Sequence, residues 1–503
     1  MFRSPFLIGL LLIALILTGC ATDTLAPQAG ATAVAIPETP RGPQARAWLI
    51  GDGAHLVAQL DQAAALAELT PQSPAVPIAG TTAVISETAI SEAQAPMPTA
   101  RSIVLPPDGS APPTPVPPAA PASLIPAPAP SDAQAAWAQP VSAWMGLEMD
   151  AIARARLTPN RAARDLAILS IALNDSYFVL DAARAQKIEV SEEAMLAAAA
   201  RQALNASHPS DAAAWQQAHD VAVWMGAWKN HDSVQAVANG IQLGKAVADA
   251  VLDRVRGDGA TAPQTFDWPE SIIPPGQPTP VPPVDRWRPV LPDQPIDPLW
   301  GKVRLIGLPS SAELAAAAPP NWDAVGFADT RTAFAAAQHA LTDEQRQLAR
   351  KWAAASGTPT LAGLWFALAR GLASGAHLDN RATARVYAAL GTTLHNAFVV
   401  SWADAYHYLV PRPTNWMHTS DPAWSPVVPA PSAPSYPSDA AVASAAAGDV
   451  LAAFFPAQTA QLAAAADEAA HSQVYAGVHW QIDTDAGKEQ GHRVGQAMLT
   501  LIR

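Results

Sequence analysis

Three short segments in the C-terminal third carry residue types that bind anions or move protons. Arg412 lies between two prolines at the end of an aromatic run, and His479 and Asp483 follow closer to the C-terminus. Between them, SYPSDAA (residues 435–441) joins a proline-rich loop to an alanine-rich run, which predicts the start of a helix. Free N–H groups and the helix dipole favour an anion at such a start, and a carboxylate such as that of Asp439 can also take that place.

The order and spacing of these segments resemble the vanadium-dependent haloperoxidase / type 2 phosphatidic acid phosphatase (acid phosphatase) superfamily. Its pattern is Lys, six residues and Arg-Pro; then Pro-Ser-Gly-His; then Ser-Arg, five residues, His, three residues and Asp. Residues 405–413, 437–440 and 472–483 reproduce this spacing. Three motifs in order are more specific than any single one. The resemblance also takes in residues 144–185, 287–289, 300–302 and 341–345, so we take it to span about residues 143–503.

The resemblance implies an all-α helical bundle with a site for phosphate or for vanadate as cofactor. In that superfamily a Lys, two Arg and backbone N–H groups hold the oxyanion, whose acceptor oxygens match planar Arg forks. Arg412 is then an anion clamp and Ser438 a hydroxyl donor. His479 is the nucleophile of a phosphatase or the vanadium ligand of a haloperoxidase. Asp483, four residues later on a predicted helix, would orient His479.

Four positions depart from the superfamily pattern. Ala405 and Gln473 stand where Lys and Arg belong, so two cations are missing. Ala440 replaces the acid/base His, a loss that typically costs about 10²–10⁴ in rate. Asp439 replaces Gly and adds a negative charge in the first helical turn, with Ser438 as the N-cap. We expect a conserved fold, a helix start closed by Asp439 and a catalytically degenerate site.

A working enzyme with a rearranged site is one alternative. In an active haloperoxidase or phosphomonoesterase, Asp439 or His407 would supply the missing proton transfer. An arginine of the proline- and tryptophan-rich insertion 263–299, such as Arg286 or Arg288, would replace a lost cation. The length of that insertion is typical of loops with a role of their own.

A metal-binding envelope protein is the other alternative, with His479, Asp483 and Asp439 as ligands. No paired motif such as HExxH supports it, and clustered His and Asp at a helix surface are usually solvated. We therefore predict no metal ligands in this chain.

The N-terminus predicts export and lipidation. Residues 5–17 are an apolar run too short for an ordinary spanning helix, and they end in Leu17-Thr-Gly-Cys20, which resembles a bacterial lipobox. Cys20 is the only cysteine, which excludes disulfides and thiolate metal sites. We expect residues 1–20 to be a lipoprotein signal peptide. Acylated Cys20 would anchor the exported chain on the outer side of the cytoplasmic membrane or in the outer membrane.

Low sequence complexity marks residues 21–139. Residues 94–130 are dense in Pro and Ala, which predicts an extended, largely disordered tether between membrane and domain. Within it, residues 45–53 predict a strand and turn, and residues 55–69 a short helix. The net charge of −13 leaves no basic patch, which argues against a nucleic-acid partner.

Residues 140–503 predict one all-α domain, because alanine-rich segments with few β-branched runs favour helices. Thr342 followed by Gln345 predicts a capping box. After Leu17, no run is long and uncharged enough to suggest a membrane span. The expected helices cover about residues 143–157, 161–185, 191–206, 211–228, 232–256, 360–374, 380–408, 440–455, 457–476 and 485–502, with a further one beginning at 342.

Overall fold

A computed structural model describes residues 48–49, 51, 53–62, 64–65, 137–266, 286–289 and 294–502. These residues form helices and no strand, which confirms the predicted all-α class. The α-helices are α2 (Ala54–Ala58), α5 (Pro140–Ala155), α6 (Pro159–Ala185), α7 (Glu192–Ser207), α8 (Ala212–Asn230), α9 (Val234–Val255), α10 (Val325–His339), α11 (Asp343–Trp352), α12 (Thr360–Gly375), α13 (Asn380–Tyr408), α14 (Pro413–Ser420), α15 (Asp439–Phe454), α16 (Thr459–Tyr475) and α17 (Gln481–Ile502).

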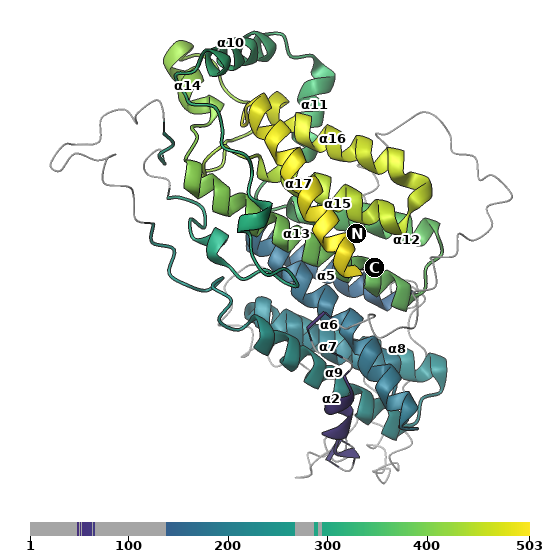
Figure 1. Cartoon of the computed structure of the whole chain (residues 1–503). Helices are drawn as coiled ribbons and strands as arrows, with labels where there is room; N and C mark the ends of the chain where they lie inside the picture. The colour runs from purple at the N-terminus through teal and green to yellow at the C-terminus, as the bar shows by residue number, and fades with distance from the viewer. Residues whose placement is uncertain are drawn as a thin grey trace, which may run out of the picture.

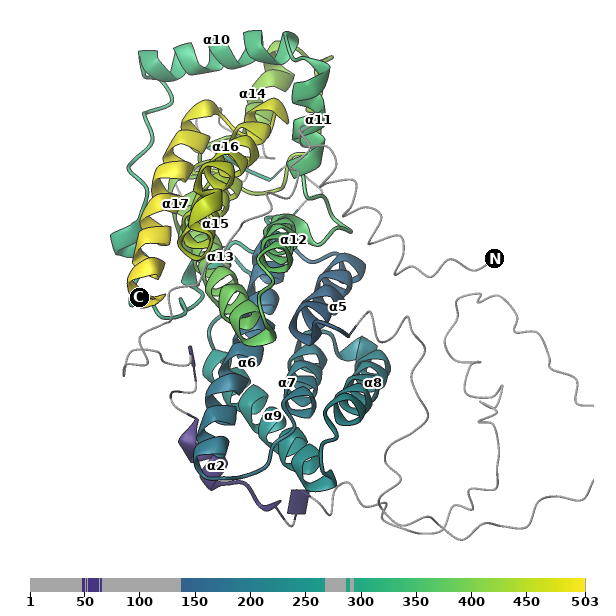
Figure 2. The same ribbon diagram turned by 90° about the vertical axis from the view of Figure 1, so that its right-hand side faces the viewer.

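Two long helices, α6 and α13, pack against each other in the middle of the bundle (Figures 1 and 2). At one end α7 packs on α6, α8 and α9, and towards the other end α15 packs on α13, α16 and α17. Helices α10, α11 and α14 cover the far end (Figure 1). The two central helices therefore divide the molecule into an N-terminal and a C-terminal half that share one apolar core.

Helix α6 is buried on nearly all sides. By length and hydropathy it is the one helix in the described part of the chain that could cross a membrane, contrary to the expectation that none would. However, 83% of its apolar window is buried inside the protein. A helix that is apolar all round and covered by neighbours is a core helix.

Local signals placed most helix boundaries correctly. Helix α13 has the predicted bounds, and α6 begins at Pro159, two residues before the predicted start at 161. The predicted capping box is confirmed: the Thr342 hydroxyl accepts the Gln345 N–H, and the Gln345 side chain accepts the Thr342 N–H. Helices α10 and α14 were not predicted from the sequence.

A glycine stripe sets the distance between α15 and α17. A Cβ on Gly491 would lie 2.4 Å from the Val442 carbonyl oxygen, and one on Gly487 would lie 2.7 Å from the Ser438 carbonyl oxygen. Only glycine permits this approach of two backbones. The contact brings the start of α15 to the start of α17, where the Ser438 N–H donates to the Asp483 carbonyl at 2.9 Å.

Part of the predicted tether is docked on the domain. The N–H groups of Trp48 and Leu49 donate to the two carboxylate oxygens of Asp175 on α6, each at 3.0 Å. In α2, Leu56 and Val57 are buried, and α2 lies against α6 and α9 (Figures 1 and 2). The short helix is thus confirmed over part of its range. In the predicted strand, the backbone N–H groups of Trp48 and Leu49 bond to the Asp175 side chain and not to another strand.

This docking shortens the part of the chain that can serve as the predicted tether. The segments on either side of residues 66–136 both belong to the folded domain. Residues 66–136, which lie outside the described residues and include the Pro/Ala-rich stretch, therefore join two parts of one body. Between Cys20 and the first described residue there remain only residues 21–47. Cys20 itself also lies outside the described residues, so its lipidation stays a prediction.

Candidate functional site

Ser438 and Asp439 begin α15 as predicted. Ser438 is the N-cap, and its hydroxyl accepts the N–H of Ala441 at 3.4 Å. Asp439 is the first helical residue, and its side chain is 20% exposed. A carboxylate at this position faces the free N–H groups and the positive end of the helix dipole. The position that could hold an external anion thus already has one.

Arg412 is buried, with 2% of its surface exposed, directly before α14. Its guanidinium donates to three backbone carbonyls: Nε to Ala433 at 2.6 Å, Nη2 to Pro434 at 3.1 Å and Nη1 to Val478 at 2.9 Å. A guanidinium has five N–H donors, and most of them are used on the protein's own backbone. Arg412 therefore ties the loop before α15 to the loop before α17.

His479 lies in the loop between α16 and α17, and not on a helix as expected. Its Nδ1 is 2.8 Å from the carbonyl oxygen of Ser435, and its Nε2 is 3.0 Å from Nη1 of Arg412. Because a carbonyl only accepts and a guanidinium only donates, neutral His479 carries its proton on Nδ1 and a lone pair on Nε2.

Asp439 faces the same edge of the His479 ring. Its Oδ1 lies 3.5 Å from Nε2. Burial alone would raise the pKa of Asp439, but the contact with His479 and the positive charge of Arg412 outweigh burial and lower the pKa. A carboxylate ion therefore lies beside the nitrogen to which the superfamily resemblance assigns the chemistry.

Asp483 lies in the first turn of α17, on the other edge of the His479 ring. Its Oδ2 accepts the N–H of Trp480 at 2.7 Å and the hydroxyl of Ser435, and it lies 3.4 Å from His479 Nδ1. Burial raises the pKa of Asp483. Its capping of Trp480 explains why α17 begins at Gln481, four residues earlier than expected.

Ser435 is the functional residue that sequence reasoning missed. Its hydroxyl donates to Asp483, and its carbonyl accepts from His479. Ser435 thus connects the carboxylate to the imidazole more closely than their direct contact does. The only signal in the sequence was its place ahead of the Tyr436-Pro437 peptide, which is cis.

The substituted positions bring no cation of their own. Ala405 on α13 and Ala440 on α15 are buried. Gln473 on α16 is also buried; its side-chain amide nitrogen donates to the Ser472 hydroxyl, and its backbone carbonyl accepts the N–H of His479 at 3.3 Å. The structure thus places Gln473 next to His479, as the motif spacing implied.

Three further residues belong to the alternative of an active enzyme with a rearranged site: His407, Arg286 and Arg288. His407 is exposed on α13, where its ring contacts Tyr408 at 4.8 Å between centroids. Arg286 is exposed and Arg288 is buried, on either side of Trp287, whose N–H donates to the Leu409 carbonyl. The insertion therefore passes the C-terminal end of α13. Replacement of a lost cation by either arginine stays a prediction.

The metal alternative does not match the geometry around His479. Asp439 faces Nε2 and Asp483 faces Nδ1, so the two carboxylates lie at opposite ring nitrogens. One ion can be bound by only one nitrogen of an imidazole. These three side chains therefore cannot surround one ion as placed.

Comparisons with known proteins agree with this fold. Residues 455–503 match the family model described as the VCPO second helical-bundle domain. A crystal structure of the first bacterial vanadium dependant iodoperoxidase matches with a TM-score of 0.61 at 21% identity, covering 71% of this chain and 95% of that chain. No protein in a search of curated sequences matches the chain significantly.

Crystal structures of holo-type and apo-type bacterial vanadium-dependent chloroperoxidase also match, with TM-scores of 0.53 and 0.51 at 12% identity. The match to the holo-type structure covers 69% of this chain and 93% of the chloroperoxidase chain. The match to the apo-type structure covers 68% of this chain and 92% of the chloroperoxidase chain. The chain therefore has the helical-bundle fold of the vanadium haloperoxidases, and the resemblance to that superfamily is confirmed at the level of fold.

Proposed function

We propose that this chain is an exported, lipid-anchored protein whose haloperoxidase-type oxyanion site is closed by its own carboxylate. It acts by binding or as a structural part of the envelope, and not as a vanadium-dependent peroxidase or a phosphatase. One observation carries the proposal: Oδ1 of Asp439 lies 3.5 Å from Nε2 of His479.

The residues present do not fit vanadate. The Nε2 lone pair that would bind vanadium is directed at Arg412, and a carboxylate lies beside it. Arg412 uses most of its N–H groups on carbonyls. Losing one partner of a desolvated charge pair costs about 2–5 kcal/mol. The loss of two cations and the gain of a like charge weaken oxyanion binding by several orders of magnitude.

Calorimetric titration of orthovanadate at low salt tests the closed site. The chain from residue 21 would be compared with D439N, which removes the charge and keeps the shape, and with A405K/D439G/A440H/Q473R, which restores the superfamily residues. We expect no binding at millimolar vanadate for the natural sequence, and tighter binding as the charge is removed and the cations return. Micromolar binding by the natural sequence would overturn the proposal.

The same titration decides the alternative of an active enzyme. If the natural sequence binds vanadate, peroxide-dependent halide oxidation and phosphomonoester hydrolysis would be assayed next. The retained tautomer of His479, with a lone pair on Nε2, is the observation that favours this alternative.

Export and anchoring rest on Leu17-Thr-Gly-Cys20. We expect the mature chain to begin at acylated Cys20 and to remain with the membrane fraction. The C20S variant should lose the acyl groups, as seen by mass spectrometry of the N-terminal peptide. An unmodified N-terminus in the natural protein would contradict this part of the proposal without affecting the closed site.

A further inference from the structure

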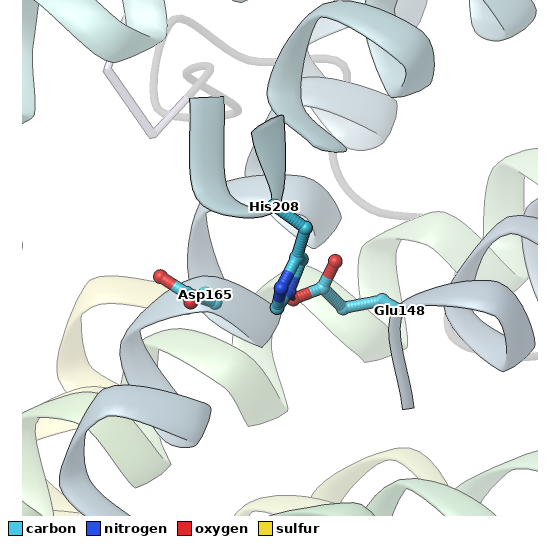
Figure 3. A group of neighbouring side chains, drawn as sticks. All are labelled: Glu148, Asp165 and His208. Carbon is cyan, nitrogen blue, oxygen red and sulfur yellow. Dashed lines mark hydrogen bonds and ion pairs between the residues drawn. The ribbon is translucent and has the colours of Figure 1, made fainter. Parts of the chain in front are cut away.

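A buried cluster of nitrogen and oxygen ligands lies in the other half of the molecule. Glu148 comes from α5, Asp165 from α6 and His208 from the residue that ends α7 (Figure 3). His208 Nε2 lies 3.1 Å from Oε1 of Glu148, and one ligand atom from each of the three residues lies within 4.8 Å of the others. Their side chains are 1%, 13% and 4% exposed in chain order.

Charge does not balance in this cluster. The neighbouring cation is Arg164, whose Nε contacts Asp258 at 2.8 Å and whose Nη1 lies 3.7 Å from Asp165. Three carboxylates, those of Glu148, Asp165 and Asp258, face one guanidinium and one imidazole, so even with a proton on His208 one negative charge is left over in a buried place. Buried charge is stable only when it is paired or bound to a metal.

We propose that Glu148, Asp165 and His208 bind one divalent transition-metal ion. Two carboxylates and an imidazole are a donor set that Zn²⁺ or Mn²⁺ accepts, whereas an all-oxygen set would favour Mg²⁺ or Ca²⁺. With a divalent ion bound to the neutral imidazole, the charges of the ion and of Arg164 balance those of the three carboxylates, and two metal bonds replace the contact between His208 and Glu148. Three protein ligands leave a coordination position for water.

The surroundings of His208 hold the proposed ligands in place. The His208 carbonyl accepts the indole N–H of Trp215 at 3.0 Å, and the Trp215 ring meets the imidazole edge-on. Arg154 lies over the same indole and pairs with Asp211 at 2.7 Å. Such outer contacts orient ligands before the metal arrives.

The site is independent of the proposed closed oxyanion site. Its residues lie on α5, α6 and the end of α7, whereas Arg412, Asp439 and His479 lie on or beside α14, α15 and α17. In the sequence the three ligands are too far apart to form a recognisable motif, so only packing of the three segments brings them together.

The test uses the whole chain from residue 21. After chelator treatment, Zn²⁺ and Mn²⁺ are titrated by calorimetry, and the bound metal is counted by mass spectrometry. We expect about one ion per chain, and binding weakened more than about tenfold in E148Q, D165N and H208Q. The matched control is H492Q, since His492 contacts the single carboxylate of Asp449 at 2.9 Å and has no third ligand. H492Q should bind metal normally.

If a variant fails to fold, a measurement on the natural sequence still tests the proposed metal site. Co²⁺ bound by one imidazole and two carboxylates should give visible d–d absorption bands, and Zn²⁺ should displace it. No stoichiometric binding of Zn²⁺, Mn²⁺ or Co²⁺ at micromolar concentration would overturn the proposal. Binding that E148Q, D165N and H208Q all leave unchanged would overturn it equally.

Discussion

Arg412 and His479 are in direct contact: Nη1 of the guanidinium lies 3.0 Å from Nε2 of the imidazole, and both residues are 2% exposed. The arginine that resemblance assigns to an external anion is thus used inside the protein. It joins the loops that precede α15 and α17 and presents a donor to the only free nitrogen of His479.

Arg412 should therefore matter for stability. We expect R412A to lower the free energy of unfolding by about 3–5 kcal/mol, because it leaves three buried carbonyls without their donor and removes the positive charge near Asp439. The control is R381A, which breaks the exposed pair with Asp181 at 2.7 Å and should cost about 0–1 kcal/mol. Urea unfolding measures both. If R412A unfolds within 1 kcal/mol of the natural sequence, the structural role is wrong.

Ser435 should be coupled to Asp483. S435A removes a hydrogen bond to a buried carboxylate and should cost about 1–3 kcal/mol. In a double-mutant cycle with D483N, the two changes should be non-additive by more than about 0.5 kcal/mol. S401A is the control, because the Ser401 hydroxyl is also buried but donates only to Phe398 on its own helix. Additive effects of S435A and D483N would show that the two side chains act separately.

The close contact of α15 and α17 predicts opposite effects at two helical glycines. G491A places a Cβ 2.4 Å from a backbone oxygen and should destabilise the protein by about 1–3 kcal/mol or more. G371A, on α12, meets nothing within 4 Å and should stabilise by up to about 1 kcal/mol. Thermal unfolding of both variants measures the difference. A neutral G491A would mean that the two helices are not held at this distance.

Docking of residues 48–62 should protect them. D175A removes the acceptor of the Trp48 and Leu49 N–H groups, and hydrogen exchange of these amides should rise in D175A. D181A on the exposed end of the same helix is the control. A chain that begins at residue 136 should also be less stable, because it lacks the buried Leu56 and Val57. Unchanged exchange in D175A would contradict the docking.

His395 should make the protein acid-sensitive. Burial lowers its pKa from 6.5 to about 4; its Nε2 donates to the Arg304 carbonyl, and Arg164 and Asp258 act on it through their charges. The unfolded chain binds this proton near pH 6.5, but the folded protein binds it only near pH 4. Stability is therefore full above pH 6.5 and falls as the pH drops towards 4, by up to about 1.4 kcal/mol per unit.

The slope of the unfolding free energy against pH shows whether His395 is the group responsible. H395Q should flatten the fall in unfolding free energy between pH 6.5 and 4, whatever its effect at neutral pH. H492Q, at an exposed histidine, should leave the slope unchanged. An identical slope in H395Q would assign the acid sensitivity to other residues.

The sequence by itself determined the fold class and most helix boundaries, and it pointed to Arg412, Asp439, His479 and Asp483 of the candidate site but not to Ser435. Helix caps and motif spacing act over a few residues, so the roles of Ser438 and Thr342 in capping could be read directly. Asp439 in the first turn of its helix followed from the same local rule.

Only the tertiary structure decided which partners these side chains choose. The carbonyls that accept hydrogen bonds from Arg412 belong to residues 433, 434 and 478. Helix α17 begins where the carboxylate of Asp483 accepts the Trp480 N–H, and the packing of the surrounding residues buries that carboxylate. The docking of Trp48 on Asp175 and the cluster of Glu148, Asp165 and His208 join segments far apart in the chain. Such contacts depend on how buried surfaces meet, and no local pattern records that.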